Sequence, residues 1–226
     1  MSRAIAIDGP AGAGKSTLAK ILAKELHYLY VDTGALYRAI GLYLLSRGID
    51  PAAAEPVTAA LDGLTVSLTY ADGEQRVLVN GEDVSGRIRT PEVSMAASAC
   101  SAIPAVRAFL LKTQRDIAAA QPVIMDGRDI GTTILPDAAV KIFLTASPES
   151  RAQRRYAELI EKGVDTTYEA VLADMNKRDY DDAHRAASPL RRAADAVPVD
   201  TSHDTPEQSV ERLKKIVRER LGESEG

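Results

Sequence analysis

The chain has 226 residues, 45% of them hydrophobic and 27% charged, with a formal net charge of -4. This length fits one α/β domain with an insert, and the apolar fraction supplies a core, which excludes a disordered chain. The acidic balance argues against a general nucleic-acid-binding protein, and no stretch reaches the roughly 18 apolar residues of a membrane helix. There is no signal-peptide pattern, and Cys100 is the single cysteine, so we expect a cytoplasmic protein without nucleic-acid or membrane partners.

Short apolar segments alternate with stretches of helical periodicity along most of the chain. Strands are expected at 4–8, 29–31, 122–126, 140–144 and 196–200, and helices at 15–26, 35–46 and 205–221. The last helix has a start signal, because Thr205 and Gln208 stand at capping-box spacing around Pro206. Alternating strands and helices predict an α/β fold with a parallel sheet of about five strands and helices on both faces.

One segment breaks the alternation. Antiparallel strands are predicted at 64–70 and 76–79, each followed by a turn, at 71–73 and at 80–81. A β-meander inside an α/β chain is most simply an inserted subdomain. We place this insert at residues 36–100, and the core domain at residues 1–35 and 101–226.

The first expected strand ends in a glycine-rich stretch that leads through Lys15 and Ser16 into the first helix. Its G-x-x-x-x-G-K-S spacing is the Walker A pattern, in the required context of a strand before and a helix after. Backbone N–H groups converge there on one anion, Lys15 reaches the β- and γ-phosphates of a nucleotide, and the Ser16 hydroxyl ligates Mg²⁺. The expected ATP-binding residues of this loop are Gly9, Pro10, Ala11, Gly12, Ala13, Gly14, Lys15, Ser16 and Thr17.

Further arginines follow other strands of the predicted sheet. Residues 32–38 come after the second strand and residues 126–132 after the third, and both turns contain arginine. Ligands of open α/β sheets bind outside the carboxyl ends of the strands, so these turns predict a second anionic ligand. Three more arginines begin the helix after Ser147, and we expect a lid at about 147–163 that clamps the transferring phosphate. Alternatively, they pair with nearby glutamates on a solvated face.

Together these motifs make the chain resemble the bacterial cytidylate kinases over essentially its whole length. The resemblance rests on IAIDGPAGAGKST, VDTGALYR, NGEDVSGRIRTPEVSMAAS, DGRDIGT and the Arg178-Asp179…Asp182…Arg185 spacing followed by SPL. It implies a P-loop nucleoside-monophosphate kinase with a five-stranded parallel core, a small antiparallel β insert and a short helical lid. The phosphoryl donor is then ATP with Mg²⁺, the acceptor is CMP or dCMP, and we expect a monomer.

The resemblance also implies which residues act. The expected catalytic residues are Lys15, Arg128, Arg154 and Arg155, Arg151 joins the ATP-binding residues, and Ser16 is the metal ligand. The expected CMP-binding residues are Thr33, Tyr37, Arg38, Arg89, Ser98, Arg107, Arg128, Asp129, Arg178, Asp182 and Arg185.

The chemistry of CMP fits several of these residue types. Cytosine presents an exocyclic amine, and the Asp129 carboxylate suits it as an acceptor. The Asp182 carboxylate suits the sugar hydroxyls, while Arg38 and Arg128 suit the phosphate through bidentate contacts.

Alternatives remain at this point. A P-loop kinase for UMP, AMP or a hydroxy acid is one, and a hydroxyl acceptor would need a base such as Asp32. A monophosphate acceptor needs none, because its second pKa is about 6 and its attacking oxygen is already anionic at neutral pH. A GTPase-like switch is another, because residues 176–179 read N-K-R-D, but this segment lies in an expected helix rather than after a core strand.

Overall fold

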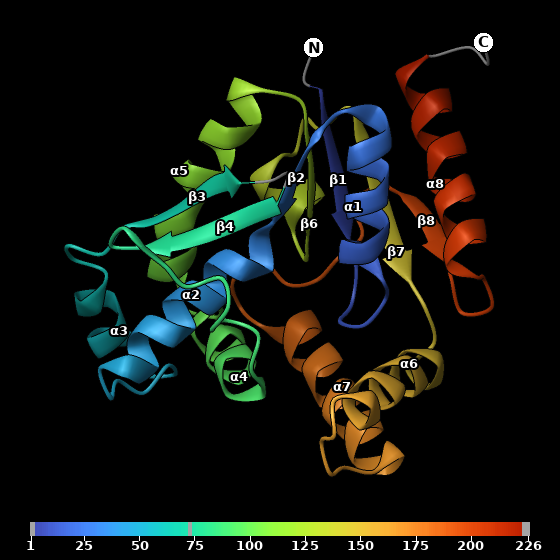
Figure 1. Ribbon diagram of the computed structural model, residues 1–226. Helices are drawn as coiled ribbons and strands as arrows, with labels where there is room; N and C mark the ends of the chain where they lie inside the picture. Colours follow the sequence, from blue (N-terminus) through green and yellow to red (C-terminus); the bar gives the residue numbers. More distant parts are fainter. Residues whose placement is uncertain (1–2, 72–73, 223–226) are drawn as a thin grey trace. The chain divides into compact units, whose positions relative to one another are not determined.

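A computed structural model describes residues 3–71 and 74–222. The main sheet has five parallel strands in the order β2-β6-β1-β7-β8 (Figure 1). Its strands are β1 (Ala4–Asp8), β2 (Leu29–Asp32), β6 (Val123–Gly127), β7 (Val140–Thr145) and β8 (Val197–Asp200). β1 is the central strand and pairs in parallel with β6 and β7. The predicted α/β fold is therefore confirmed.

A second, three-stranded antiparallel sheet has the order β3-β4-β5. Its strands are β3 (Val66–Ala71), β4 (Glu74–Val79) and β5 (Glu82–Asp83). The predicted meander is confirmed, and the predicted turn at 71–73 includes residues 72 and 73, which lie outside the described residues.

The helices are α1 (Lys15–Leu26), α2 (Thr33–Ser46), α3 (Ala54–Ala60), α4 (Pro91–Cys100), α5 (Pro104–Ala120), α6 (Pro148–Glu161), α7 (Tyr168–His184) and α8 (Pro206–Leu221), with a π-helical turn, η1, at Ile130–Ile134.

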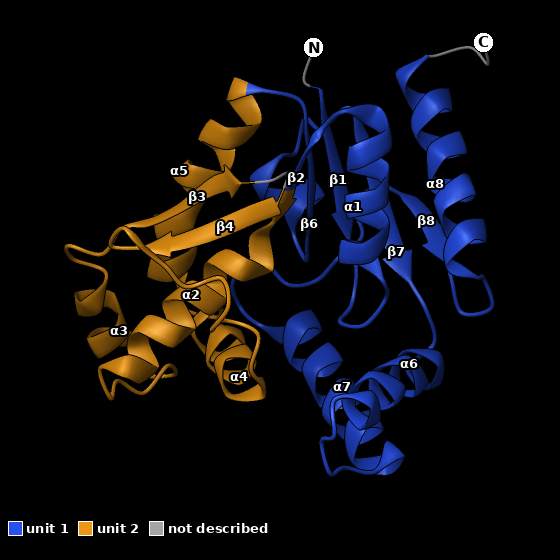
Figure 2. Cartoon of the chain, viewed as in Figure 1, with its two compact units in different colours: residues 1–30, 121–226 blue, residues 31–120 orange. Residues whose placement is uncertain are grey.

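The chain divides into two compact units, residues 1–30 with 121–226 and residues 31–120 (Figure 2). The first unit carries the main sheet except for the last two residues of β2, and its core joins the strands to helices α1 and α8. Val210, Leu213 and Val217 of α8 are buried there. The predicted division into a core domain and an insert at 36–100 stays a prediction, because compactness alone does not show which segments move together.

The second unit is built on helix α2, which supplies Leu36, Ile40 and Leu44 to a core shared with the small sheet. Helices α2 and α4 approach closely at Gly41. A Cβ atom at Gly41 would lie only 2.9 Å from the backbone nitrogen of Ala97. This glycine therefore lets the two helices meet backbone to backbone.

Candidate active site

The glycine-rich loop runs from the buried end of β1 to the first turn of α1. Gly9, Gly12 and Gly14 all have positive φ, at 151°, 73° and 84°. This region of the backbone map is open to glycine at little cost, so the loop can turn its N–H groups inward. Gly14 is the N-cap of α1, and no side chain caps this helix end. The loop and the helix start thus make an anion site of the kind that binds phosphate.

Lys15 begins helix α1 and is buried, with 5% of its surface exposed. Its Nζ atom donates a hydrogen bond to the Pro10 carbonyl at 2.7 Å. Burial and the nearby Arg128 charge lower the pKa of Lys15 to about 7, against the opposing effect of carboxylates that include Asp126 and Asp182. A phosphate placed beside this amine would favour its charged form.

Ser16 and Asp126 bring a hydroxyl and a carboxylate together beside the loop. Ser16 Oγ donates to Asp126 Oδ2 at 2.8 Å, and Tyr30 Oη donates to Asp126 Oδ1 at 2.9 Å. Sequence reasoning predicted Ser16 as a metal ligand and missed Asp126. The signal was present, because Asp126 is an acid at the end of a strand, but the sequence does not show that β6 lies next to β1.

This oxygen pair fits Mg²⁺, which prefers oxygen ligands and usually keeps several water or phosphate ligands around one or two protein groups. Among the described residues, no group of three or more His, Cys, Asp or Glu side chains is placed to hold a metal. A Mg²⁺ ion brought in with a nucleotide needs no such group.

Asp8 ties the phosphate loop to the turn that follows β6. It is the last residue of β1 and is 4% exposed. Its two carboxylate oxygens accept from the backbone nitrogens of Ile130 and Gly131, each at 2.8 Å. These residues directly follow Arg128 and Asp129. Burial, with the charge of Asp129, raises the pKa of Asp8 to about 6, although these hydrogen bonds and Lys15 oppose the shift.

This buried carboxyl predicts a measurable pH dependence of stability. Its folded pKa of about 6 exceeds the ordinary 3.8, so the folded chain holds the proton more tightly than the unfolded chain. The stabilisation is complete below about pH 4 and is lost as the pH rises through 6. Relative to Asp8→Asn, the wild type should gain roughly 2.5 kcal/mol of unfolding free energy between pH 7 and pH 4. Urea unfolding of both proteins across this range checks it, and parallel pH curves would contradict it.

The predicted acceptor residues of the first unit gather in one charge network. Arg128 Nε donates to Asp182 Oδ2 at 2.7 Å. Arg185 lies 3.6 Å from Asp182 and 3.9 Å from Asp129. Burial alone would raise the pKa of Asp182, but Arg128 and Arg185 outweigh it and hold this pKa below its ordinary value. Arg178 belongs to the same network, and burial together with the Arg128 charge lowers its pKa.

The three lid arginines have different surroundings. Arg151 is 2% exposed and forms a bidentate pair with Asp179, at 3.1 and 2.5 Å. Its guanidinium also donates to the carbonyl of Ala146 at 2.8 Å and to that of Ala11, in the phosphate loop, at 2.9 Å. We call this arrangement the Arg151 tether. Asp179, on helix α7, is thus engaged by Arg151, and residues 176–179 do not follow a core strand as a guanine-reading motif would.

The other two lid arginines are held more loosely. Arg154 Nη2 donates to the Thr201 carbonyl at 2.6 Å. Arg155 pairs with Glu158 at 3.0 Å, and 42% of the Arg155 side chain is exposed. Exposed pairs of this kind contribute little to stability, so Arg155 can change partner at small cost.

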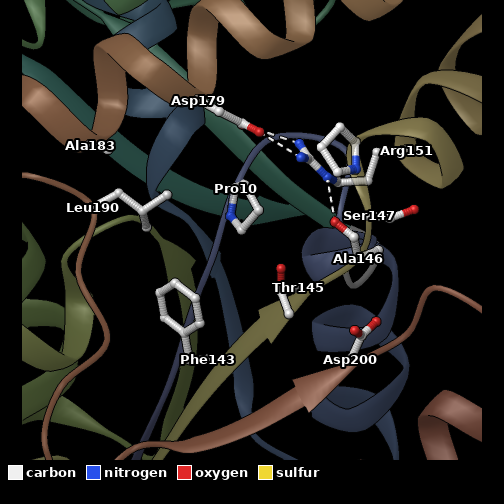
Figure 3. Close-up of a pocket in the computed structure, with 11 residues that line it drawn as sticks. Pro10, Phe143, Thr145, Ala146, Ser147, Arg151, Asp179, Ala183, Leu190 and Asp200 are labelled. Carbon is white, nitrogen blue, oxygen red and sulfur yellow. Dashed lines mark hydrogen bonds and ion pairs between the residues drawn. The ribbon is translucent and has the colours of Figure 1, made fainter.

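A hollow of about 430 Å³ borders the phosphate loop within the first unit (Figure 3). Its lining is mixed in character and comprises Pro10, Phe143, Thr145, Ala146, Ser147, Pro148, Arg151, Asp179, Ala183, Leu190 and Asp200. Apolar rings and aliphatic groups thus stand beside a few hydroxyl and carboxylate groups. This combination suits a flat heteroaromatic ligand with polar edges.

The remaining predicted acceptor residues lie in the second unit, three of them around Asp32. Asp32 is the N-cap of α2, and its Oδ1 accepts from the Ala35 nitrogen at 2.9 Å. Its Oδ2 pairs with Arg38 Nη2 at 2.7 Å and with Arg89 Nη2 at 3.4 Å. Arg38 Nε is buried and has no hydrogen-bond partner in the described part of the chain. Thr33 is the next residue after Asp32 and is buried.

A second group in this unit links Tyr37, Ser98 and Arg107. The Arg107 guanidinium lies 5.7 Å from the centre of the Tyr37 ring, within the range of a cation–π contact. Arg107 also donates to the Ser101 carbonyl at 3.3 Å, and Ser101 Oγ donates to the Ser98 carbonyl at 2.8 Å. The structure therefore brings the predicted residues together within each unit.

No single helix within residues 3–71 and 74–222 is long and apolar enough to span a membrane. Taken together, helices α4 and α5 are long and apolar enough for a span by length and composition only, but the pair is bent by 100°.

Comparison with known proteins agrees with the geometry of the site. The family model of cytidylate kinases matches residues 5–219. A cytidylate kinase of Caldicellulosiruptor saccharolyticus is 48% identical over 218 residues, which cover 96% of this chain and 96% of that protein. One of Mycolicibacterium paratuberculosis is 49% identical over 217 residues, covering 96% of this chain and 95% of that protein. The chain therefore belongs to the cytidylate kinase family and is a nucleoside-monophosphate kinase.

Proposed function

We propose that this chain transfers the γ-phosphate of ATP to CMP or dCMP, giving CDP or dCDP and ADP. The observation that carries the proposal within the family is that each of the two units holds, in addition to the phosphate loop of the first, arginines fixed by a carboxylate. Asp32 holds Arg38 and Arg89, and Asp182 holds Arg128 and Arg185. Fixed arginines suit a phosphate-bearing acceptor.

The surroundings of Asp32 argue against the alternative with a hydroxyl acceptor. That reaction would need Asp32 as a base, yet both oxygens of this carboxylate are engaged, by the Ala35 nitrogen and by two arginines. These partners would have to be displaced before the carboxylate could take a proton from an acceptor hydroxyl. A monophosphate needs no base, since its attacking oxygen is largely ionised at neutral pH.

On the donor side, the glycine loop binds the phosphates of ATP, and Lys15 meets the charge that develops on the transferred group. Ser16 is the metal ligand, with Asp126 beside it, and Mg²⁺ supplies charge neutralisation at the β- and γ-phosphates when bound. We place the adenine base in the hollow beside Pro10, where Phe143 and Leu190 offer apolar surface. With alignment and charge neutralisation in place, the protein has little covalent chemistry to perform.

The lid arginines divide between these tasks. The weak exposed pair of Arg155 supports a phosphate-clamping role for it together with Arg154. The Arg151 tether supports a different role for Arg151 on the ATP side, because breaking a buried bidentate pair is costly. Arg151 then serves ATP by holding the carbonyl of Ala11 and the loop around it.

On the acceptor side the residues are those that the family resemblance implies, and their chemistry and ion pairs suggest the roles. Arg38, Arg89 and Arg128 bind the phosphate, Asp182 with Arg178 and Arg185 binds the sugar, and Asp129 reads the amine of cytosine. Thr33, Tyr37, Ser98 and Arg107 complete the set. We also propose a monomer in the cytoplasm, which light scattering and cell fractionation can check.

A coupled assay of ADP production tests the proposal directly. CMP, dCMP, UMP, AMP and shikimate are offered as acceptors at equal concentration with ATP and Mg²⁺. We expect CMP and dCMP to give the highest kcat/KM. A higher value for AMP or shikimate would overturn the proposal.

Asp129→Ala tests the reading of the base. In UMP a carbonyl stands in place of the amine donor. With UMP bound, the Asp129 carboxylate of the wild type would therefore face another buried acceptor. Discrimination by an unpaired buried group is large, often several kcal/mol. The variant should therefore lose about a hundredfold or more in kcat/KM for CMP and much less for UMP. Steady-state kinetics with both acceptors measure the ratio, and equal losses would mean that Asp129 only holds neighbouring arginines.

A further inference from the structure

A glutamine side chain of the small sheet completes the hydrogen bonding at the end of β2. Gln75 Oε1 accepts from the backbone nitrogen of Asp32 at 2.8 Å, and Gln75 Nε2 donates to the Asp32 carbonyl at 3.4 Å. One primary amide thus meets both the donor and the acceptor of a single residue, as a neighbouring strand would. The two residues are 43 positions apart in the chain.

The position of Gln75 in its strand is unusual for a glutamine. Side chains two apart in a strand point to the same face, and Val77 and Val79 of β4 are buried in the core of the second unit. Gln75 continues this row, where an apolar residue would be the ordinary choice. A polar group on a core-facing row needs a hydrogen-bond partner, and the Asp32 backbone provides it on both sides of the amide.

Asp32 connects this amide to two arginines. Its backbone is held by Gln75, and its carboxylate holds Arg38 and Arg89. The Arg38 side chain is 21% exposed, and its buried Nε lacks a hydrogen-bond partner among the described residues. A shift of the Asp32 backbone would move the carboxylate and thus the guanidinium group that it orients.

We propose that Gln75 is a positioning residue for the phosphate of the acceptor, acting through Asp32 on Arg38 and Arg89. This inference rests on the proposed function, in which these arginines bind that phosphate. The small antiparallel sheet then has a direct part in acceptor binding, through one side chain that itself need not contact the acceptor.

Gln75→Met tests the proposal, because methionine keeps the length of the side chain and removes the amide. Loss of two hydrogen bonds should raise KM for CMP by roughly tenfold. KM for ATP should stay within about twofold, and kcat should change little, because the donor site is untouched. Arg76→Met is the matched control: Arg76 is the next residue of the same strand, points to the opposite face and lies 4.0 Å from Asp83.

A double-mutant cycle separates positioning from loss of structure. If Gln75 acts through the two arginines, the KM effect of Gln75→Met should disappear in a background that carries both Arg38→Met and Arg89→Met. Three outcomes would each overturn the proposal. They are KM effects that multiply in the double-mutant cycle, equal changes in KM for CMP and for ATP, and a change in KM for CMP no larger than that caused by Arg76→Met. Should Gln75→Met fail to fold, as circular dichroism would show, Gln75→Glu, which keeps one acceptor oxygen, takes its place in the same comparisons. A wild type that does not phosphorylate CMP would instead overturn the proposed function.

Discussion

Replacing Lys15 with alanine is expected to lower kcat by about a thousandfold while CMP binding changes by less than about twofold. The amine of Lys15 is buried at the start of α1, beside the carbonyl of Pro10. In the proposed reaction the loop receives the phosphates of ATP, and the positive charge of Lys15 balances the negative charge of the transferring phosphoryl group. Burial of the amine strengthens such an interaction.

Steady-state kinetics and calorimetric titration with CMP check this expectation. Lys24→Ala is the control, because Lys24 is an exposed lysine in the last turn of the same helix. It should leave both quantities unchanged. A Lys15→Ala enzyme with more than about a tenth of wild-type kcat would remove the role assigned to this residue.

Gly9→Ala is expected to cause a severe loss of stability. A Cβ atom at Gly9 would lie 1.8 Å from the carbonyl oxygen of Leu144, a backbone atom of the neighbouring strand β7. Gly9 also has a φ of 151°, which side-chain-bearing residues rarely adopt. Relief would require β1 and β7 to separate in the centre of the sheet. We expect a loss of more than about 4 kcal/mol of unfolding free energy, or no folded protein.

A second glycine variant separates the cost of the steric clash from the cost of backbone strain. Gly48 has a φ of 67°, and among the described residues no atom comes within 4 Å of a Cβ placed there. Gly48→Ala therefore meets strain alone and should cost about 1 kcal/mol. Denaturant unfolding of both variants gives the comparison. Equal losses would show that the contact with Leu144 relaxes easily.

The sequence predicted elements best where the signal is local. Helix α1 spans the predicted residues 15–26, and helix α8 begins with the predicted capping box, in which Thr205 and Gln208 exchange both hydrogen bonds. The predicted strands of the main sheet agree with the structure to within one or two residues. By contrast, η1 was not predicted, because the carboxylate of Asp8, more than a hundred residues earlier, caps its first nitrogens.

Within the candidate site, residue types could be predicted but partners could not. The arginines after Ser147 suggested a phosphate clamp, yet the partner of Arg151 is Asp179, 28 positions further along the chain. The amide of Gln75 reaches Asp32 across 43 positions. Such pairs depend on how strands and helices are ordered in space, which periodicity does not encode.

The Arg151 tether has a consequence for how quickly ATP can bind. Its partners are Asp179 and the carbonyls of Ala146 and Ala11, all of them protein atoms, so the joint between α6, α7 and the phosphate loop is complete before a nucleotide arrives. A preorganised edge of this kind loses little conformational entropy on binding. We therefore expect ordering of the chain at this edge to contribute little to the barrier for ATP association. If the predicted lid moves, we expect the movement to begin after Arg151, on the side of Arg155, whose side chain is 42% exposed.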